Sequence, residues 1–257
     1  MSSFEATLTL IGGPTVLIEL AGLRFLTDPT FDEPGVYQGG VTLEKTTPPA
    51  LSAEEVGAVD AVLLSHDQHF DNLDRAGRAF LARARTTFTT PAGAGRLGGN
   101  AFGLEPWRSQ RFESGGGAVY VTAAPARHGP AGIEPISGDV AGFLLGLDAP
   151  GDALYFAGDT VWYDGVAEVA RRYRPRIVLL NAGSAEPRGK FHVTMDANDA
   201  IEAAHAFPQA KIVAVHNEGW RHFAESAEDL AHAFRTLGLA ERLQPLERGR
   251  ATKLSFL

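Results

Sequence analysis

The sequence predicts an α/β protein whose β-sheets are covered by helices. Short apolar runs, typical of buried strands, alternate with segments of helical spacing along most of the chain. The 257 residues contain 29 glycines and 15 prolines, which indicates many turns between short elements. A hydrophobic share of 44% and a charged share of 21% argue against disorder and against a coiled coil. No repeat or biased linker divides the chain, so we expect a single domain over residues 1–257.

The first part of the chain is rich in predicted strands. Four apolar or alternating runs predict strands at residues 6–11, 15–20, 23–27 and 60–65. Gly-Gly-Pro and Ala-Gly turns separate the first three of these runs. Residues 73–85 carry apolar side chains at helical spacing and predict a helix, although Gly77 lies inside it. The glycine-rich region 93–117 is interpreted as loops over one edge of the fold.

Strands and helices alternate in the rest of the chain. Further apolar runs predict strands at residues 118–123, 142–147, 153–157, 176–181 and 211–215. Helical spacing predicts helices at residues 161–172, 195–207 and 223–237, of which the second ends before Pro208. Residues 243–246 and 251–256 are expected to form a last pair of strands at an edge.

Composition excludes several classes of function. The chain has no cysteine, so disulfides, thiolate metal sites and cysteine nucleophiles are ruled out. Lys and Arg total 23 against 31 Asp and Glu, a net charge of −8, and this balance favours a small-molecule substrate over nucleic acid or anionic lipid. No apolar run is long enough to span a membrane, and the first residues lack a secretion signal, so we expect a cytoplasmic protein. A homo-oligomer is left open.

Metal-capable side chains follow four of the predicted strands. His66 follows residues 60–65, and His128, Asp159 and His216 come soon after later strands. Ligand sites in α/β folds gather beyond the carboxyl ends of strands. Any one of these residues could simply be a polar residue at a strand end. Four such positions favour a common site instead.

The densest group of such side chains lies in residues 65–74. His66, His69 and Asp71 could reach one cation from a single turn, and imidazole with carboxylate suits Zn²⁺, Mn²⁺ or Fe²⁺. The alternative is a polar turn in which Asp71 or Asn72 caps the following helix. The two interpretations can hold together, because a capping residue can still face a metal.

The chain resembles the metallo-β-lactamase superfamily. That family has a His-x-His-x-Asp-His turn after a strand, and then a His, an Asp and a final His after later strands. Segments 25–31 (FLTDPTF) and 191–196 (FHVTMD) resemble the branch that contains ascorbate-6-phosphate lactonase and the N-acylphosphatidylethanolamine phospholipases. The resemblance covers nearly the whole chain and implies an αββα sandwich of two mixed sheets flanked by helices.

This chain departs from the family turn. The best fit, His66-x-x-His69-x-Asp71-Asn72, needs one inserted residue (Asp67 or Gln68) and puts an amide where the family has its last His. A fit without the insertion would put Asp67 in the first His position, and Gln68 could replace His69 as a ligand. The amide is a weaker ligand than imidazole and leaves the second site in doubt.

Carried onto this sequence, the resemblance implies two adjoining metal sites. His66, His69 and His128 would hold one ion, while Asp71 and His216 would hold a second ion that Asp159 bridges to the first. Zn²⁺ is the expected metal, with Mn²⁺ or Fe²⁺ as alternatives and one or two ions bound.

Weaker candidates surround this set. The resemblance implies that Asp28 accepts a hydrogen bond from a ligand His, or else it serves the turn before Pro29. His192 could donate a proton to a leaving group, or be an exposed loop His. Trp220 and His222 follow His216 closely and could line the pocket mouth. The tryptophans Trp107, Trp162 and Trp220 could contact the substrate.

The favoured function is a metal-dependent hydrolase. A bound cation would supply hydroxide for attack on an ester, lactone, amide or phosphodiester bond. The residues expected to act in catalysis are Asp71, Asp159 and His192. The alternative is a binding or scaffold protein with a degenerate metal site, which the change at Asn72 motivates. A nuclease is disfavoured because no basic tract is present.

Overall fold

Two mixed β-sheets lie face to face in this protein. The computed structural model describes residues 4–115 and 117–256. The larger sheet has seven strands in the order β15-β1-β2-β3-β6-β7-β8. Their bounds are β1 (Phe4–Gly12), β2 (Thr15–Leu20), β3 (Leu23–Thr27), β6 (Val59–Leu63), β7 (Ala84–Thr89), β8 (Ala101–Gly103) and β15 (Ala251–Phe256). The strands β3, β6, β7 and β8 are parallel, and the others pair antiparallel.

The second sheet has six strands in the order β14-β13-β12-β11-β10-β9. Their bounds are β9 (Ser109–Ser114), β10 (Gly117–Pro125), β11 (Ala141–Gly146), β12 (Leu154–Phe156), β13 (Ile177–Asn181) and β14 (Lys211–Val215). The strands β12, β13 and β14 are parallel, and β11 runs antiparallel to both β12 and β10. Strand β10 therefore points the same way as β12, β13 and β14, so the carboxyl ends of four strands meet at one edge.

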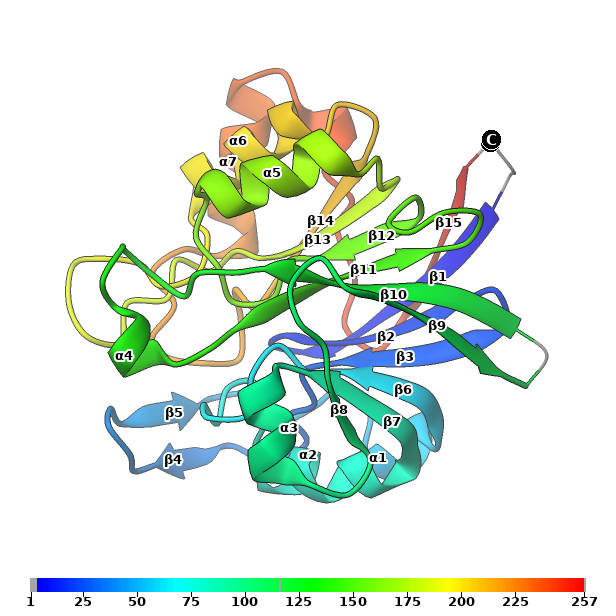
Figure 1. Cartoon of the computed structure of the whole chain (residues 1–257). Coiled ribbons are helices and arrows are strands. Elements are labelled where there is room, and N and C mark those ends of the chain that lie inside the picture. The colour runs from blue at the N-terminus through cyan, green and yellow to red at the C-terminus, as the bar shows by residue number, and fades with distance from the viewer. Residues whose placement is uncertain (1–3, 116, 257) are drawn as a thin grey trace.

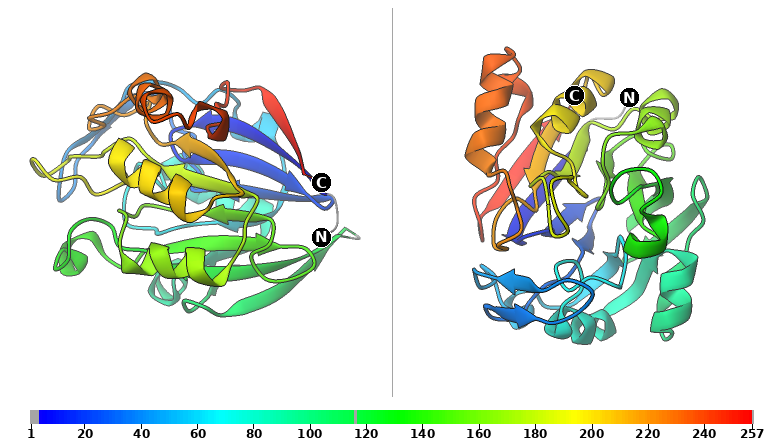
Figure 2. Two further views of the ribbon diagram at one scale, coloured as in Figure 1. Left: turned by 90° about the horizontal axis from the view of Figure 1, so that it is seen from above. Right: turned by 90° about the vertical axis from the view of Figure 1, so that its left-hand side faces the viewer.

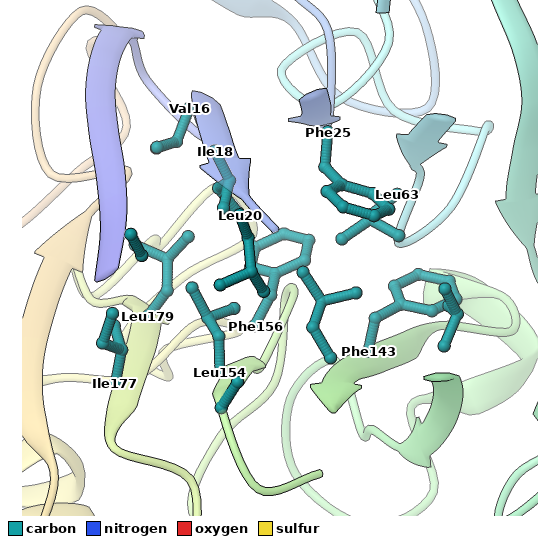
Figure 3. Packing of buried hydrophobic residues seen from close by; sticks show 14 of the residues in the cluster. Val16, Ile18, Leu20, Phe25, Leu63, Phe143, Leu154, Phe156, Ile177 and Leu179 are labelled. Carbon is teal, nitrogen blue, oxygen red and sulfur yellow. The ribbon is translucent and has the colours of Figure 1, made fainter. Parts of the chain in front are cut away.

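The main core fills the space between the sheets. Figure 3 shows Phe25 and Leu63 of the first sheet facing Phe143 and Phe156 of the second. Side chains point alternately to the two faces of a sheet along each strand. Leu26 and the other apolar residues on the outer face of the first sheet therefore belong to a separate buried cluster. The central strands of both sheets are thus buried on both faces, which explains why they are nearly continuous apolar runs in the sequence.

Helices cover both outer faces of the sandwich (Figure 1). The outer face of the six-stranded sheet carries α5 (Asp164–Arg172), α6 (Ala197–Ala206) and α7 (Ala227–Thr236), and their apolar residues form one buried cluster with it. The seven-stranded sheet is covered by α1 (Ala53–Val56), α2 (Arg75–Phe80) and α3 (Pro91–Leu97). This confirms the predicted αββα sandwich. Within the described ranges, no helix is long and apolar enough to cross a membrane.

One end of the sandwich is bordered by segments from several parts of the chain. A hairpin of β4 (Gly35–Tyr37) and β5 (Leu43–Lys45), the short helix α4 (Glu134–Ser137) and the loop between β13 and α6 lie at this end. In the right view of Figure 2, which faces this end, the hairpin is blue, α4 is green and the loop is yellow.

The structure differs from the sequence-based expectations at several places. The helix predicted over residues 73–85 ends early, because α2 is followed by a 3₁₀ turn, η1 (Leu81–Arg83), and β7, which contains three β-branched threonines, then begins at Ala84. The glycine-rich region is not all loop, because Thr90 caps α3 and two short strands follow. The expected strand 243–246 is wrong: after a second 3₁₀ turn, η2 (Ala240–Arg242), Leu243 makes an isolated bridge to Ile212.

Candidate metal centre

Three histidines converge at one end of the sandwich. His66 follows β6, His69 lies on the same turn, and His128 follows β10. His69 Nδ1 lies 2.8 Å from His66 Nε2 and 3.1 Å from His128 Nε2. One ring nitrogen of each residue lies within 4.8 Å of the others, and His66 and His128 are buried. The turn after β6 and the end of β10 therefore bring three potential metal ligands together.

Burial keeps two of these rings neutral. It lowers the pKa of His66 well below its usual value, and the neighbouring imidazoles of His69 and His128 lower it further. Burial and His128 likewise lower the pKa of His69. A neutral imidazole has a free lone pair, which is the form that binds a metal.

Hydrogen bonds orient two of the rings. His128 Nδ1 donates to the carbonyl of Val193 at 2.7 Å, and its Nε2 faces His69. His66 Nδ1 lies 3.0 Å from Ser65 Oγ, and that hydroxyl donates to Asp28 Oδ2 at 2.7 Å. Asp28 therefore reaches His66 through Ser65, whereas the family resemblance implied a direct hydrogen bond.

Asp159 lies between the three histidines and His216. Its Oδ1 accepts hydrogen bonds from Asn181 Nδ2 at 2.7 Å and from His216 Nδ1 at 3.1 Å, and its Oδ2 lies 3.7 Å from His128 Nε2. Burial opposes ionisation of this carboxyl, but His216, His128 and His66 hold its pKa well below the usual value. The carboxylate is thus charged and touches both groups of imidazoles.

A second carboxylate, Asp71, also lies beside His216. Its Oδ2 is 3.7 Å from His216 Nε2 and 3.0 Å from His222 Nε2. Although burial raises the pKa of Asp71, His222 and His216 lower it far more. Burial lowers the pKa of His216, but Asp159 and Asp71 raise it above its usual value. His216 also has a φ of 56°, in the left-handed region, and such strain clusters at functional sites.

Several buried polar atoms here have no hydrogen-bond partner among the described residues. They are Asp71 Oδ1, Asp159 Oδ2, His216 Nε2 and His222 Nδ1. Buried polar atoms are nearly always paired, so a cluster of unpaired ones needs an explanation. Carboxylate oxygens and imidazole nitrogens are ligands of divalent transition metals. The donor set therefore fits one or two such ions.

The two residues around the insertion lie outside the histidine group. Asp67 accepts hydrogen bonds from Arg96 Nε and Nη2 at 2.5–3.1 Å, which ties the turn to α3. The Gln68 side chain packs against Gly138, where an added Cβ would meet its Oε1 at 2.0 Å. The structure thus brings His69, and not Gln68, beside His66 and His128.

Position 72 is turned into the protein. Asn72 is fully buried, and its Nδ2 donates to Asp28 Oδ2 at 2.9 Å. His222, on the loop after β14, contacts Asp71 instead. The sequence placed His222 only at the pocket mouth, because nothing in its spacing from His216 shows that the loop folds back onto Asp71.

His192 and the three tryptophans are not among the residues that line the pocket described next. His192 Nε2 is 3.2 Å from Asp199 Oδ2, and Nδ1 is 3.6 Å from Asp196 Oδ2. Its catalytic role stays a prediction. Trp220 is buried against Tyr37.

A pocket opens above His69, Asp71, His128 and His222. Its walls are mainly apolar and come from the hairpin, the α4 region and the loop before α6: Val41, Leu43, Ile133, Ala185, Pro187 and Val193. Arg188 is exposed at the mouth, close to Gly40 of the hairpin. Among the residues that line the pocket, Arg188 supplies the basic side chain of the lysine or arginine type. The pocket thus joins a polar floor to an apolar wall with a cation at its rim.

Comparison with known proteins agrees with this geometry. A family profile described as "Beta-lactamase superfamily domain" matches residues 23–217. The chain belongs to the metallo-β-lactamase superfamily. It is 27% identical over 256 residues to the UPF0173 protein YddR of Bacillus subtilis, covering 94% of this chain and 97% of that protein.

The chain is also similar to two proteins whose names describe hydrolysis. It is 25% identical over 196 residues to the N-acyl-phosphatidylethanolamine-hydrolyzing phospholipase D 1 of Caenorhabditis elegans, covering 70% of this chain and 54% of that protein. The crystal structure of an isothiocyanate hydrolase from Delia radicum gut bacteria superposes with a TM-score of 0.82 at 25% identity, covering 97% of this chain and 99% of that chain.

Proposed function

We propose that this protein is a metal-dependent hydrolase of small molecules. One observation carries the proposal: ring nitrogens of three histidines converge beside a charged carboxylate, Asp159, that also touches His216. Relatives named as hydrolases support the reaction class. A scaffold with a degenerate site is disfavoured, because the imidazoles and carboxylates lie together and most of them are buried.

The residues divide into two ligand groups. His66, His69 and His128 would hold a first ion, and Asp71 with His216 would hold a second. Asp159, between the groups, would contact both. Zn²⁺ suits this thiolate-free set of imidazoles and carboxylates, as do Mn²⁺ and Fe²⁺. When bound, such an ion lowers the pKa of water toward neutrality and polarises the bond under attack.

The chain's own groups would position the reactants. Asp159 Oδ2 is ionised and has no hydrogen-bond partner among the described residues, so it can accept a proton or hydrogen bond from the attacking water. Asn181 fixes this carboxylate through Oδ1. Asp71 Oδ1 is unpaired in the same way and is the second acceptor on the pocket floor.

Proton donation to the leaving group is proposed for His192. Its hydrogen bond with Asp199 raises its pKa, although partial burial opposes this, so the ring stays protonated to higher pH than a free imidazole. The ring contacts α6 rather than the pocket floor, but the next residue, Val193, lines the pocket and holds His128. A shift of this loop would be needed for direct transfer.

The pocket narrows the substrate class. Its apolar walls suit an apolar body, and Arg188 at the rim suits a carboxylate, phosphate or other anionic group. We propose an ester, lactone, amide or phosphodiester that carries such a group. Isothiocyanates are a second candidate, since the isothiocyanate hydrolase shares nearly the full length of this chain.

The test combines metal loading with a substrate panel. Chelated protein would be reloaded with Zn²⁺, Mn²⁺ or Fe²⁺ and assayed with 4-nitrophenyl esters, a γ-lactone, an anilide, bis(4-nitrophenyl) phosphate and benzyl isothiocyanate. We expect metal-dependent turnover of one class, lost in His128→Ala and kept in His232→Ala, a matched change on α7. A protein that binds none of these ions would overturn the proposal.

A further inference from the structure

The side chain at position 72 is committed to a hydrogen-bond network beneath the metal centre. Asn72 Nδ2 donates to Asp28 Oδ2, and the same carboxylate accepts from the Ser65 backbone N–H at 2.6 Å and from Ser65 Oγ at 2.7 Å. All three residues are fully buried. The amide nitrogen of Asn72 thus serves Asp28, and only Asn72 Oδ1 has no hydrogen-bond partner among the described residues, so this side chain offers at most an amide oxygen where the family has an imidazole.

The imidazole of His222 lies beside Asp71. His222 Nε2 lies 3.0 Å from Asp71 Oδ2, and its side chain is only 9% exposed. His216 Nε2 lies 3.7 Å from the same oxygen. Two ligands that each lie about 2.1 Å from one ion are roughly 3.0–3.4 Å apart, so the Asp71–His222 distance matches a pair of ligands on one ion.

The loop that carries His222 is anchored on both sides. Arg221 forms a bidentate ion pair with Glu44 of β5 at 2.5 and 2.7 Å, and its backbone N–H donates to the Glu44 carbonyl. The His222 carbonyl accepts from Glu186 N at 3.0 Å, and the ring lies 4.6 Å from that of Phe223. The imidazole is therefore held in place by the fold, as a ligand must be.

We propose that His222 is a ligand of the second ion and takes the part of the imidazole that position 72 lacks. The second site would then consist of Asp71, Asp159, His216 and His222, which contribute four buried atoms without a hydrogen-bond partner among the described residues: Asp71 Oδ1, Asp159 Oδ2, His216 Nε2 and His222 Nδ1. The inference rests on the proposed metal-dependent function. It makes the second site an imidazole-rich one suited to Zn²⁺, rather than a weakened amide site.

The closing experiment counts metal ions directly and needs no substrate. Chelated protein would be titrated with Co²⁺ by calorimetry, with the visible absorption recorded at each addition. Four proteins would be compared: wild type, His222→Ala, His222→Asn and His232→Ala. The Asn variant can still donate a hydrogen bond to Asp71 but is a poor ligand, and His232 is a histidine of α7 outside the site.

We expect two equivalents in the wild type and in His232→Ala. Both His222 variants should keep the first equivalent and bind the second at least about tenfold more weakly, since losing even an outer partner of a metal ligand costs roughly 10- to 100-fold. The absorption change of the second equivalent should also differ from the wild type.

Other outcomes overturn the proposal and locate the error. Wild-type behaviour of His222→Asn would show that His222 only donates to Asp71. A single equivalent in the wild type would show that no second site forms. No binding in any protein would contradict the proposed metal-dependent function itself.

Discussion

Asp159 and His216 form a fully buried pair in which Asp159 Oδ1 accepts a hydrogen bond from His216 Nδ1 at 3.1 Å. They come from different strands, since Asp159 follows β12 and His216 follows β14. The second carboxylate oxygen of Asp159 points toward His128 on the other side. One side chain thus links the two imidazole groups on which the proposed function rests.

Replacing that carboxylate should abolish turnover. Asp159→Asn keeps the shape of the side chain but removes the charge that faces His128 and His216. We expect activity to fall on the order of 100-fold or more, with weaker metal binding, because a ligand and an acceptor for the attacking water are lost together. Kinetics and metal content would be measured beside Glu202→Gln, an exposed change on α6. Full activity of Asp159→Asn would refute the role.

The pH dependence of stability should change in His192→Gln. Because Asp199 raises the pKa of His192, the ion pair stabilises the fold fully below the unfolded pKa of about 6.5 and is lost as pH rises through the raised folded pKa. The gap in unfolding free energy between wild type and variant should therefore be larger at pH 6 than at pH 8.5 in urea titrations.

The same variant separates two roles for His192. If the ring donates the leaving-group proton, the alkaline limb of the wild-type kcat profile should disappear in His192→Gln. An unchanged profile with lower stability would leave His192 as a residue that secures the loop to α6.

Arg188 should select for anionic substrates. The side chain is exposed at the pocket mouth, so Arg188→Gln should raise the KM of mono-4-nitrophenyl glutarate about tenfold, while that of 4-nitrophenyl butyrate stays unchanged. Lys190→Gln, a neighbour with a 99% exposed side chain, is the control. Equal effects on both esters would contradict recognition of charge.

Asn72 should matter for stability more than for metal binding. Asn72→Leu removes one of three donors to the buried Asp28, and we expect a loss of about 1–3 kcal/mol in unfolding free energy. The number of bound metal ions should not change. If Asn72→Leu loses the second ion while its fold is intact, then position 72, and not His222, serves that site.

Much of the fold was predictable because both sheets are buried on two faces. The strands Thr15–Leu20, Leu23–Thr27 and Lys211–Val215 have the predicted bounds, since their apolar runs end at clear turns. Strand β7 was missed because its first residue, Ala84, continues the helical spacing of Phe80 and Leu81. The short α3 was hidden by its glycines, and only the Thr90-Pro91 cap signals it.

The site was predictable where ligands follow strands directly. His66, His128, Asp159 and His216 were proposed in this way, and the structure places them close together, while their role as ligands stays a prediction. The contact of His222 with Asp71 depends on how a loop folds back, and the place of Arg188 depends on a loop meeting the hairpin. Neither leaves a periodic signal in the sequence, because both are set by tertiary packing.

The central claim is that the three converging histidines hold a metal ion. Elemental analysis of protein purified without chelators, and again after loading, tests it most directly in wild type and in His128→Ala. We expect Zn²⁺, Mn²⁺ or Fe²⁺ in the wild type and at least one equivalent less in the variant, which should stay folded. A wild type that carries no transition metal even after loading would contradict the account.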